Sequence, residues 1–147
     1  MKKREEIAKE YQWRMEDLYE NHDAWEQDFL KLQEGMEVLK GFAGTAGESS
    51  EQLKKLMQCC DELNMLAENV YVYANQRMHE NTADSYYQGL AGRAQMLLVQ
   101  LSEAASFIEP EILGIPEPVL MEMIEKEEGL WVYRTYFTRL LRRKAHI

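Results

Sequence analysis

The sequence predicts an all-α protein, a helical bundle with a long antiparallel αα-hairpin and short C-terminal helices. Apolar residues recur at spacings of three and four through most of the chain, and no strand-like alternation persists. The three prolines all fall within residues 110–118, so the long stretches before them lack the residue that breaks helices. For 147 residues we expect one domain, residues 1–147, which opens with a lead segment over residues 1–21.

The first expected helix follows the lead segment. The apolar anchors expected in that segment are Trp13, Met15, Leu18 and Tyr19. Asn21 or Asp23 suits the N-cap, and the helix should run to about Lys40. Its apolar stripe comprises Trp25, Phe29, Leu32, Met36 and Leu39. Three glycines within residues 41–47 then predict a loop, which lacks the preceding strand and the Gly-Lys-Ser/Thr of a phosphate loop.

Two long helices form the expected hairpin. Ser49 or Ser50 caps the first, which runs to about Glu80, and after a break and cap at residues 81–82 the second spans about residues 83–107. Helices of about 25–30 residues joined by a short turn must lie antiparallel. The first has the apolar stripe Leu53, Leu56, Met57, Cys60, Leu63, Ala67, Val70, Tyr71 and Ala74. The second has the stripe Tyr86, Leu90, Ala94, Leu97, Leu98, Leu101 and Ala105.

Prolines and glycines divide the rest of the chain into short elements. Residues 109–111 (Glu-Pro-Glu) should bend the chain, and Gly114 should end a short turn. Pro116 or Pro118 suits the first turn of a helix that runs to about Glu127. Gly129 should separate it from a last helix. The apolar residues of that last helix are Leu130, Tyr133, Phe137, Leu140 and Leu141.

Charge is unevenly distributed along this acidic chain, whose net charge is −9. Residues 128–147 carry five basic residues and one acidic residue. We expect these cations to complement the end of a helix, with an RNA-binding or membrane-binding arm as the alternative. The acidic remainder argues against a nucleic-acid partner. Apolar runs as short as residues 96–99, and a start without an apolar secretory signal, favour a cytoplasmic protein with no membrane partner.

Histidine and cysteine offer no recognisable site. The three histidines are His22, His79 and His146. His79-Glu80 is the single His-Glu pair, and the second histidine of a zinc-binding H-E-x-x-H helix would stand at position 83, which is alanine. His79 should instead act as a cation at a helix end or lie on the surface. The adjacent Cys59 and Cys60 should be reduced, buried thiols. We therefore expect no catalytic, cofactor-binding or metal-binding residue, and substrate-binding residues stay unknown.

Paired carboxylates and clustered aromatics have an ordinary and a functional interpretation. The carboxylate groups are Glu16-Asp17, Glu109 with Glu111, and Glu125 with Glu127-Glu128. Solvated faces are expected for them, because acid–base chemistry needs contrasting, partly buried environments. The aromatic set is Tyr71, Tyr73, Tyr86, Tyr87, Trp131, Tyr133, Tyr136 and Phe137. Core packing is expected for these rings, and a groove for a peptide or a partner domain is the alternative.

Short motifs in a fixed order carry a family resemblance. They lie at residues 13–19, 24–26, 42–44, 71–77, 86–90, 106–113 and 141–146. Together they resemble the N-terminal domain of oligoendopeptidase F, in the thimet-oligopeptidase-like family of zinc metallopeptidases. Ala145 stands where that family often has proline.

The resemblance implies a parent enzyme that hydrolyses peptide bonds in short oligopeptides with one zinc ion. That zinc would lie in a C-terminal catalytic domain of the same polypeptide, beyond Ile147, where this chain is expected to be truncated. This chain would be the non-catalytic N-terminal lobe, a helical wall of the channel, with no cofactor of its own. Its uncovered apolar face predicts self-association. The alternative is a stand-alone helical interaction module that forms a homodimer.

Overall fold

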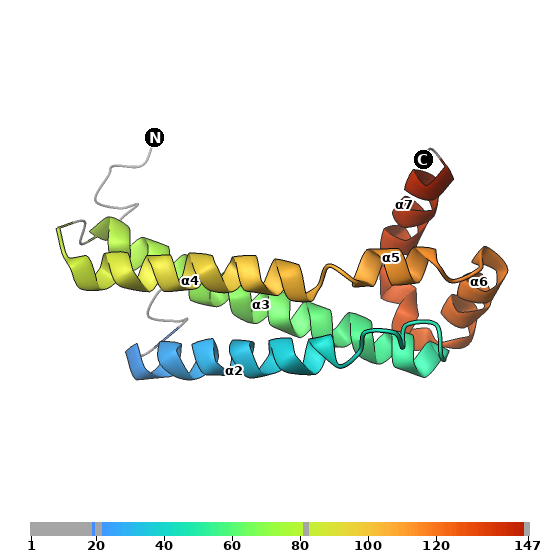
Figure 1. The fold of residues 1–147 in the computed structure, drawn as a ribbon, viewed down its shortest axis with the longest axis horizontal. Helices are drawn as coiled ribbons and strands as arrows, with labels where there is room; N and C mark the ends of the chain where they lie inside the picture. The colour runs from blue at the N-terminus through green and yellow to red at the C-terminus, as the bar shows by residue number, and fades with distance from the viewer. Residues whose placement is uncertain (1–18, 20–21, 81–82, 146–147) are drawn as a thin grey trace. The chain divides into compact units, whose positions relative to one another are not determined.

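The computed structural model describes residues 19, 22–80 and 83–145, and every regular element in that part of the chain is helical. In chain order these are α2 (His22–Lys40), α3 (Ser50–Glu80), α4 (Ser85–Ala104), α5 (Ile108–Leu113), α6 (Glu117–Lys126), a 3₁₀ helix η1 (Glu128–Tyr133) and α7 (Arg134–Ala145). Figure 1 shows this order from blue to red. The predicted all-α class is confirmed.

The chain folds as two compact units. Unit 1 combines the described residues up to Gly35 with Leu63–Leu101, and unit 2 combines Met36–Glu62 with the described residues from Ser102 onward. Most of the expected lead segment, with the anchors Trp13, Met15 and Leu18, lies outside the described residues, whereas Tyr19 is buried. One domain over residues 1–147 stays a prediction. No helix among the described residues is both long and apolar enough to span a membrane.

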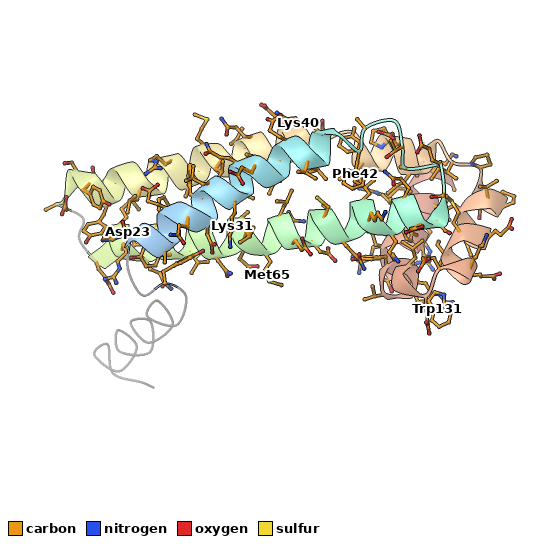
Figure 2. All side chains as sticks on the ribbon, turned by 90° about the horizontal axis from the view of Figure 1, so that it is seen from below. Asp23, Lys31, Lys40, Phe42, Met65 and Trp131 are labelled. Atoms are coloured by element: carbon orange, nitrogen blue, oxygen red, sulfur yellow. The ribbon has the colours of Figure 1, made fainter. Side chains whose placement is uncertain are left out.

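Unit 1 contains the predicted hairpin. Its parts of α3 and α4 run in opposite directions because only four residues connect the two helices (Figure 1). Trp25 of α2 is fully buried, and its indole Nε1 donates a hydrogen bond to the Val70 carbonyl of α3 at 3.0 Å. Figure 2 shows Met65 on the outer side of α3, where its side chain is exposed. Apart from Tyr71, Tyr86 and Leu98, the apolar stripes are buried in this unit, as the spacing predicted.

A second interaction in unit 1 joins α2 to α4. The Arg93 guanidinium donates two hydrogen bonds to the Glu26 carboxylate, with N–O distances of 2.6 and 2.8 Å. The same guanidinium lies over the rings of Phe29 and Trp25, with its Cζ 4.5 and 5.3 Å from their centroids. Planar stacking and a bidentate carboxylate are two contacts that arginine makes well and lysine does not.

Unit 2 is organised around a glycine-containing loop and the short C-terminal helices. Residues 41–49 connect α2 to α3, and Gly44 adopts a φ of +84°, which favours glycine. The Glu111 carboxylate of α5 accepts hydrogen bonds from the Gly44 amide at 2.8 and 2.9 Å and from the Ala46 amide at 3.5 Å. The loop is therefore held by a side chain 67 residues away in sequence.

Helix ends agree with the sequence only in part. Ser49 caps α3, since its Oγ accepts from the Gln52 amide at 3.0 Å, as expected. The cap of α4 was wrongly placed, because the Asp84 carboxylate accepts from the Tyr86 amide at 2.9 Å. Asp23 lies inside the first turn of α2, where an acidic residue favours the helix dipole, and Asn21 lies outside the described residues.

The chain from the end of α4 onward corrects three further expectations. Pro110 does not bend the chain, because it lies in the first turn of α5, where its missing N–H needs no partner. Helix α4 ends at Ala104 instead of residue 107, and a turn over residues 105–107 leads into α5. Gly129 lies within η1, so a 3₁₀ turn leads directly into α7.

Two tyrosines differ from the predicted stripes. Tyr73 is buried and Tyr71 only half-buried, because positions 67, 70, 73 and 74 keep the three-and-four spacing and position 71 falls beside it. Tyr86 is 51% exposed, because it lies in the first turn of α4 and packs against other rings at the surface. Half-buried members of the predicted stripes are Cys60, Leu98, Ala105, Tyr133 and Leu141.

Two glycines of unit 1 provide a matched test of close helix packing. A methyl group at Gly35 of α2 would overlap Cδ2 of Leu63 in α3, whereas one at Gly92 of α4 would meet open space. Because alanine favours a helix over glycine, Gly92→Ala should raise the free energy of unfolding by about 0.5–1 kcal/mol. Gly35→Ala should lower it by about 1–2 kcal/mol through overpacking. Urea denaturation checks both, and equal stabilisation by the two variants would contradict the close approach.

The Glu26–Arg93 pair should make the stability of unit 1 depend on pH. Hydrogen bonds from Arg93 hold the pKa of Glu26 below its usual range. A carboxyl group whose pKa is lower in the folded state stabilises the fold fully at pH values above its unfolded-state pKa of about 4.3. This stabilisation disappears as the pH falls through the folded-state pKa. Glu26→Gln should therefore lower the free energy of unfolding by about 0.5–1 kcal/mol at pH 7, the range of a well-formed exposed pair.

Below the folded-state pKa, the difference between Glu26→Gln and the unmodified protein should vanish. Glu34→Gln on the same helix is the control, since Glu34 is exposed and forms no ion pair within the described part of the chain. Chemical denaturation at a series of pH values measures both variants. A constant difference across that series would contradict the role assigned to the pair.

Candidate functional site

Histidine 22 lies at the centre of an aromatic group in unit 1, the His22–tyrosine cluster (His22, Tyr73, Tyr86 and Tyr87). The Tyr73 hydroxyl lies 3.1 Å from Nδ1 of His22, and the Tyr87 hydroxyl lies 3.4 Å from Nε2. The imidazole also contacts the Tyr86 and Tyr87 rings, each with a centroid distance of 5.6 Å. The first residue of α2 thereby contacts both helices of the hairpin.

Both ring nitrogens of His22 have a partner in this cluster. A neutral imidazole has one donor nitrogen and one acceptor nitrogen, and a tyrosine hydroxyl can serve either. The group therefore behaves as a satisfied, half-buried polar residue that connects three helices. The sequence pattern gives no signal for the role of His22, because Tyr73 and Tyr87 lie 51 and 65 residues away.

His79 does not belong to this cluster. His79 is exposed in the last turn of α3, where a cation interacts favourably with the helix dipole, and His146 lies outside the described residues. Within residues 19, 22–80 and 83–145, no group of three or more His, Cys, Asp and Glu side chains could hold a metal ion. The described residues therefore offer no donor set that fits a zinc ion.

Cysteine and tyrosine form a second local group in unit 2. Cys59 and Cys60 are half-buried, and burial raises the pKa of Cys59, which makes its thiolate less available as a nucleophile. The Tyr133 hydroxyl donates to the Asp61 carboxylate at 2.5 Å. Burial and this carboxylate raise the pKa of Tyr133, so the hydroxyl stays protonated and ties η1 to α3.

The predicted carboxylate groups have separate structural roles. Glu109 pairs with Arg143 at 3.0 Å, while Glu111 holds the loop after α2. Glu127 pairs with Lys54 at 3.4 Å and accepts from the Gly129 amide. The expectation of plain solvated faces is therefore wrong for the half-buried Glu111 and Glu127, whose neighbouring backbone amides needed an acceptor. Glu16 and Asp17 lie outside the described residues, and Glu125 and Glu128 are exposed.

A shallow hollow lies between α5 and α7 in unit 2. Its volume is about 460 Å³, and its lining residues are Glu109, Tyr136, Arg139, Leu140, Arg142 and Arg143. Burial raises the pKa of Tyr136, so this hydroxyl is a donor at neutral pH. The predicted aromatic residues therefore do not form one group. In unit 2, Tyr133 and Tyr136 pack against Phe137, whereas Tyr73, Tyr86 and Tyr87 contact His22 in unit 1. The sequence placed the basic residues at a helix end but could not show that α5 closes one side of a hollow.

This chain is similar to several known proteins, although it matches no family model. No model of a protein family matches the chain. It is 29% identical to oligopeptidase PepF of Bacillus subtilis over 98% of its own length and 22% of that protein. It is 28% identical to the group B oligopeptidase PepB of Streptococcus agalactiae, over 98% of the chain and 24% of that protein.

A solved structure shows the same relationship. The crystal structure of oligoendopeptidase F from Enterococcus faecium matches with a TM-score of 0.76 at 28% identity, over 86% of this chain and 25% of that one. The chain spans about a quarter of the length of the curated relatives that it matches. The resemblance predicted from the motifs is confirmed: the chain is a relative of oligoendopeptidase F and corresponds to a partial, N-terminal region of those proteins.

Proposed function

We propose that this chain is the non-catalytic N-terminal region of a peptidase like oligoendopeptidase F, in which it forms one wall of the substrate channel. The observation that carries the proposal is the structural match, which covers most of this chain and only a quarter of the oligoendopeptidase F chain. Three quarters of such a protein therefore lies elsewhere and can hold the catalytic groups. The parent would hydrolyse peptide bonds in short oligopeptides in the bacterial cytoplasm.

The residues of this chain support placing the catalytic groups in another part of the parent protein. The sequence has no H-E-x-x-H, since residues 79–83 read His-Glu-Asn-Thr-Ala. Zinc would therefore be bound by the C-terminal catalytic domain of the same polypeptide, and no step of the hydrolysis is assigned to a residue of this chain. What this chain supplies is a scaffold of long helices joined by buried contacts such as Trp25 to Val70.

A wall of this kind would act by excluding large substrates. The Arg93–Glu26 pair and the His22–tyrosine cluster connect the helices of unit 1 to one another. These helices should therefore move little when a peptide passes. Restricting access in this way explains why such an enzyme would act on short peptides. It requires no catalytic group in the wall itself.

Domain replacement tests the proposal directly. Deleting the matching region from Bacillus subtilis PepF should lower the hydrolysis of a quenched fluorescent oligopeptide by about tenfold or more, because the substrate is no longer positioned. Inserting this chain in its place should restore that activity. The 147-residue protein alone, with and without added zinc, is the control. Zinc-dependent turnover by this chain alone would overturn the proposal that it is non-catalytic, and a chimera as inactive as the deletion would overturn the proposed role.

A second candidate function, a stand-alone interaction module that forms a homodimer, rests on exposed apolar side chains in unit 2. Val119 and Met121 of α6 are 44% and 45% exposed, and Trp131 and Val132 of η1 are 44% and 79% exposed. Figure 2 shows Trp131 projecting outward. The surface of α6 and η1 therefore carries exposed apolar side chains that a partner can cover.

Sedimentation velocity tests for self-association through this surface. If the exposed apolar residues of α6 and η1 associate, the protein should form a concentration-dependent dimer, and Val132→Glu should make it monomeric because a charge would be buried at the contact. Met65→Glu in unit 1 is the matched control, since Met65 is 66% exposed and lies outside this surface. A monomer at every concentration, or an equal effect of both substitutions, would contradict the homodimer.

A further inference from the structure

The hollow between α5 and α7 combines cationic and apolar groups. Three guanidinium groups, from Arg139, Arg142 and Arg143, line it together with one carboxylate, from Glu109. The half-buried Tyr136 and the almost fully buried Leu140 complete its lining. The hollow is therefore a local positive site on a chain whose net charge is −9.

Its arginines are not all explained as cations at a helix end. Arg143 pairs with Glu109 at 3.0 Å, and Lys144 donates to the Leu113 carbonyl at 2.7 Å, so these two residues tie α7 to α5. Arg139 lies before the last turn of α7, whose basic residues are Arg142, Arg143 and Lys144. Within the described part of the chain, Arg139 and Arg142 form no ion pair.

The spacing of these two arginines favours an anion between them. Residues three apart on a helix are neighbours on its surface, and two like charges at this spacing repel one another. A bound anion would remove that repulsion. Guanidinium groups match a carboxylate with two parallel hydrogen bonds, and the Tyr136 residue lines the same hollow.

The geometry points to the carboxylate of an oligopeptide as the ligand of this hollow, and we propose that Arg139 and Arg142 bind it. This deepens the proposed function and rests on it, because the peptide substrate comes from there. A nucleic acid would need an extended basic face, whereas the rest of this chain is acidic. A peptide needs only the two free guanidinium groups for its carboxylate. The half-buried Tyr136 side chain would contact the side chain beside that carboxylate.

Peptide binding to the 147-residue protein tests the inference. The probe is an acetylated leucine–alanine dipeptide with a free carboxylate, compared with the same peptide carrying a C-terminal amide and with inorganic phosphate. Titration followed by protein NMR should show binding of the acid and at least tenfold weaker binding of the amide, since the amide cannot accept the charged hydrogen bonds. The melting temperature should rise with the acid alone.

Substitutions then assign the site. The Arg139→Gln/Arg142→Gln variant should weaken binding of the acid about tenfold or more, because glutamine cannot form the charge-assisted hydrogen bonds to the carboxylate. The Arg139→Lys/Arg142→Lys variant should also bind more weakly, since it keeps the charge but loses the planar fork. Arg134→Gln is the matched control, because Arg134 lies over the Trp131 ring and does not line the hollow.

Three results would overturn the inference: no binding of the acid, equal binding of acid and amide, or binding of phosphate as tight as that of the acid. Binding that Arg134→Gln weakens as much as the double variant would also overturn it. Failure here is distinguishable from failure of the proposed function, because this binding requires no catalysis. An active chimera without peptide binding at the hollow refutes this inference alone, and peptide binding with an inactive chimera refutes the channel-wall role alone.

Discussion

The burial of Trp25 is the interaction on which unit 1 depends. Its indole is fully buried, and Nε1, its one polar atom, donates to the Val70 carbonyl of α3. That carbonyl oxygen also takes part in the backbone hydrogen bonding of the helix. The Phe29 and Tyr73 rings pack on it, and Arg93 covers it from α4. One side chain thus fixes α2 against both helices of the hairpin. A large aromatic residue with a single donor is suited to this role, because it buries much apolar area and leaves only one hydrogen bond to satisfy.

Unit 2 solves a different problem, since short helices and a loop cannot bury as much apolar area individually. The Glu111 carboxylate holds the loop amides, and side chains from α7 bond to α5. Leu120 and Ile112 of this unit are fully buried. The polar groups are therefore arranged around a small apolar core, and their partners lie mostly on other elements. This arrangement makes the identity of each charged residue more important here than on the exposed face of a long helix.

Local patterns predicted the long helices well. The three-and-four spacing placed α2 and α3 to within a residue or two at each end, because amphipathic periodicity and capping depend on near neighbours in sequence. The bend predicted at Pro110 is wrong. A proline breaks the interior of a helix but fits its first turn, and α5 begins two residues before Pro110, at Ile108. The burial of Tyr73 and the exposure of Tyr86 depend on which rings meet across helices, which no local pattern contains.

The contacts of the candidate sites were still less accessible to sequence reasoning. Arg93 and Glu26 are 67 residues apart, and so are Gly44 and Glu111. In a single sequence, such pairs cannot be told from the many other opposite charges. The motif order nevertheless identified the relatives, because several short motifs in sequence are specific even when each is weak.

The two described tryptophans differ in surroundings in a way that makes each unit optically distinct. Trp25 is enclosed by apolar and aromatic groups in unit 1, whereas Trp131 is 44% exposed in unit 2. Indole fluorescence shifts to longer wavelength as its surroundings become more polar, so the two residues emit in different parts of the spectrum. Loss of structure around Trp25 changes the blue side of the emission, and loss of structure around Trp131 changes the red side. The protein thus carries an intrinsic optical reporter in each unit.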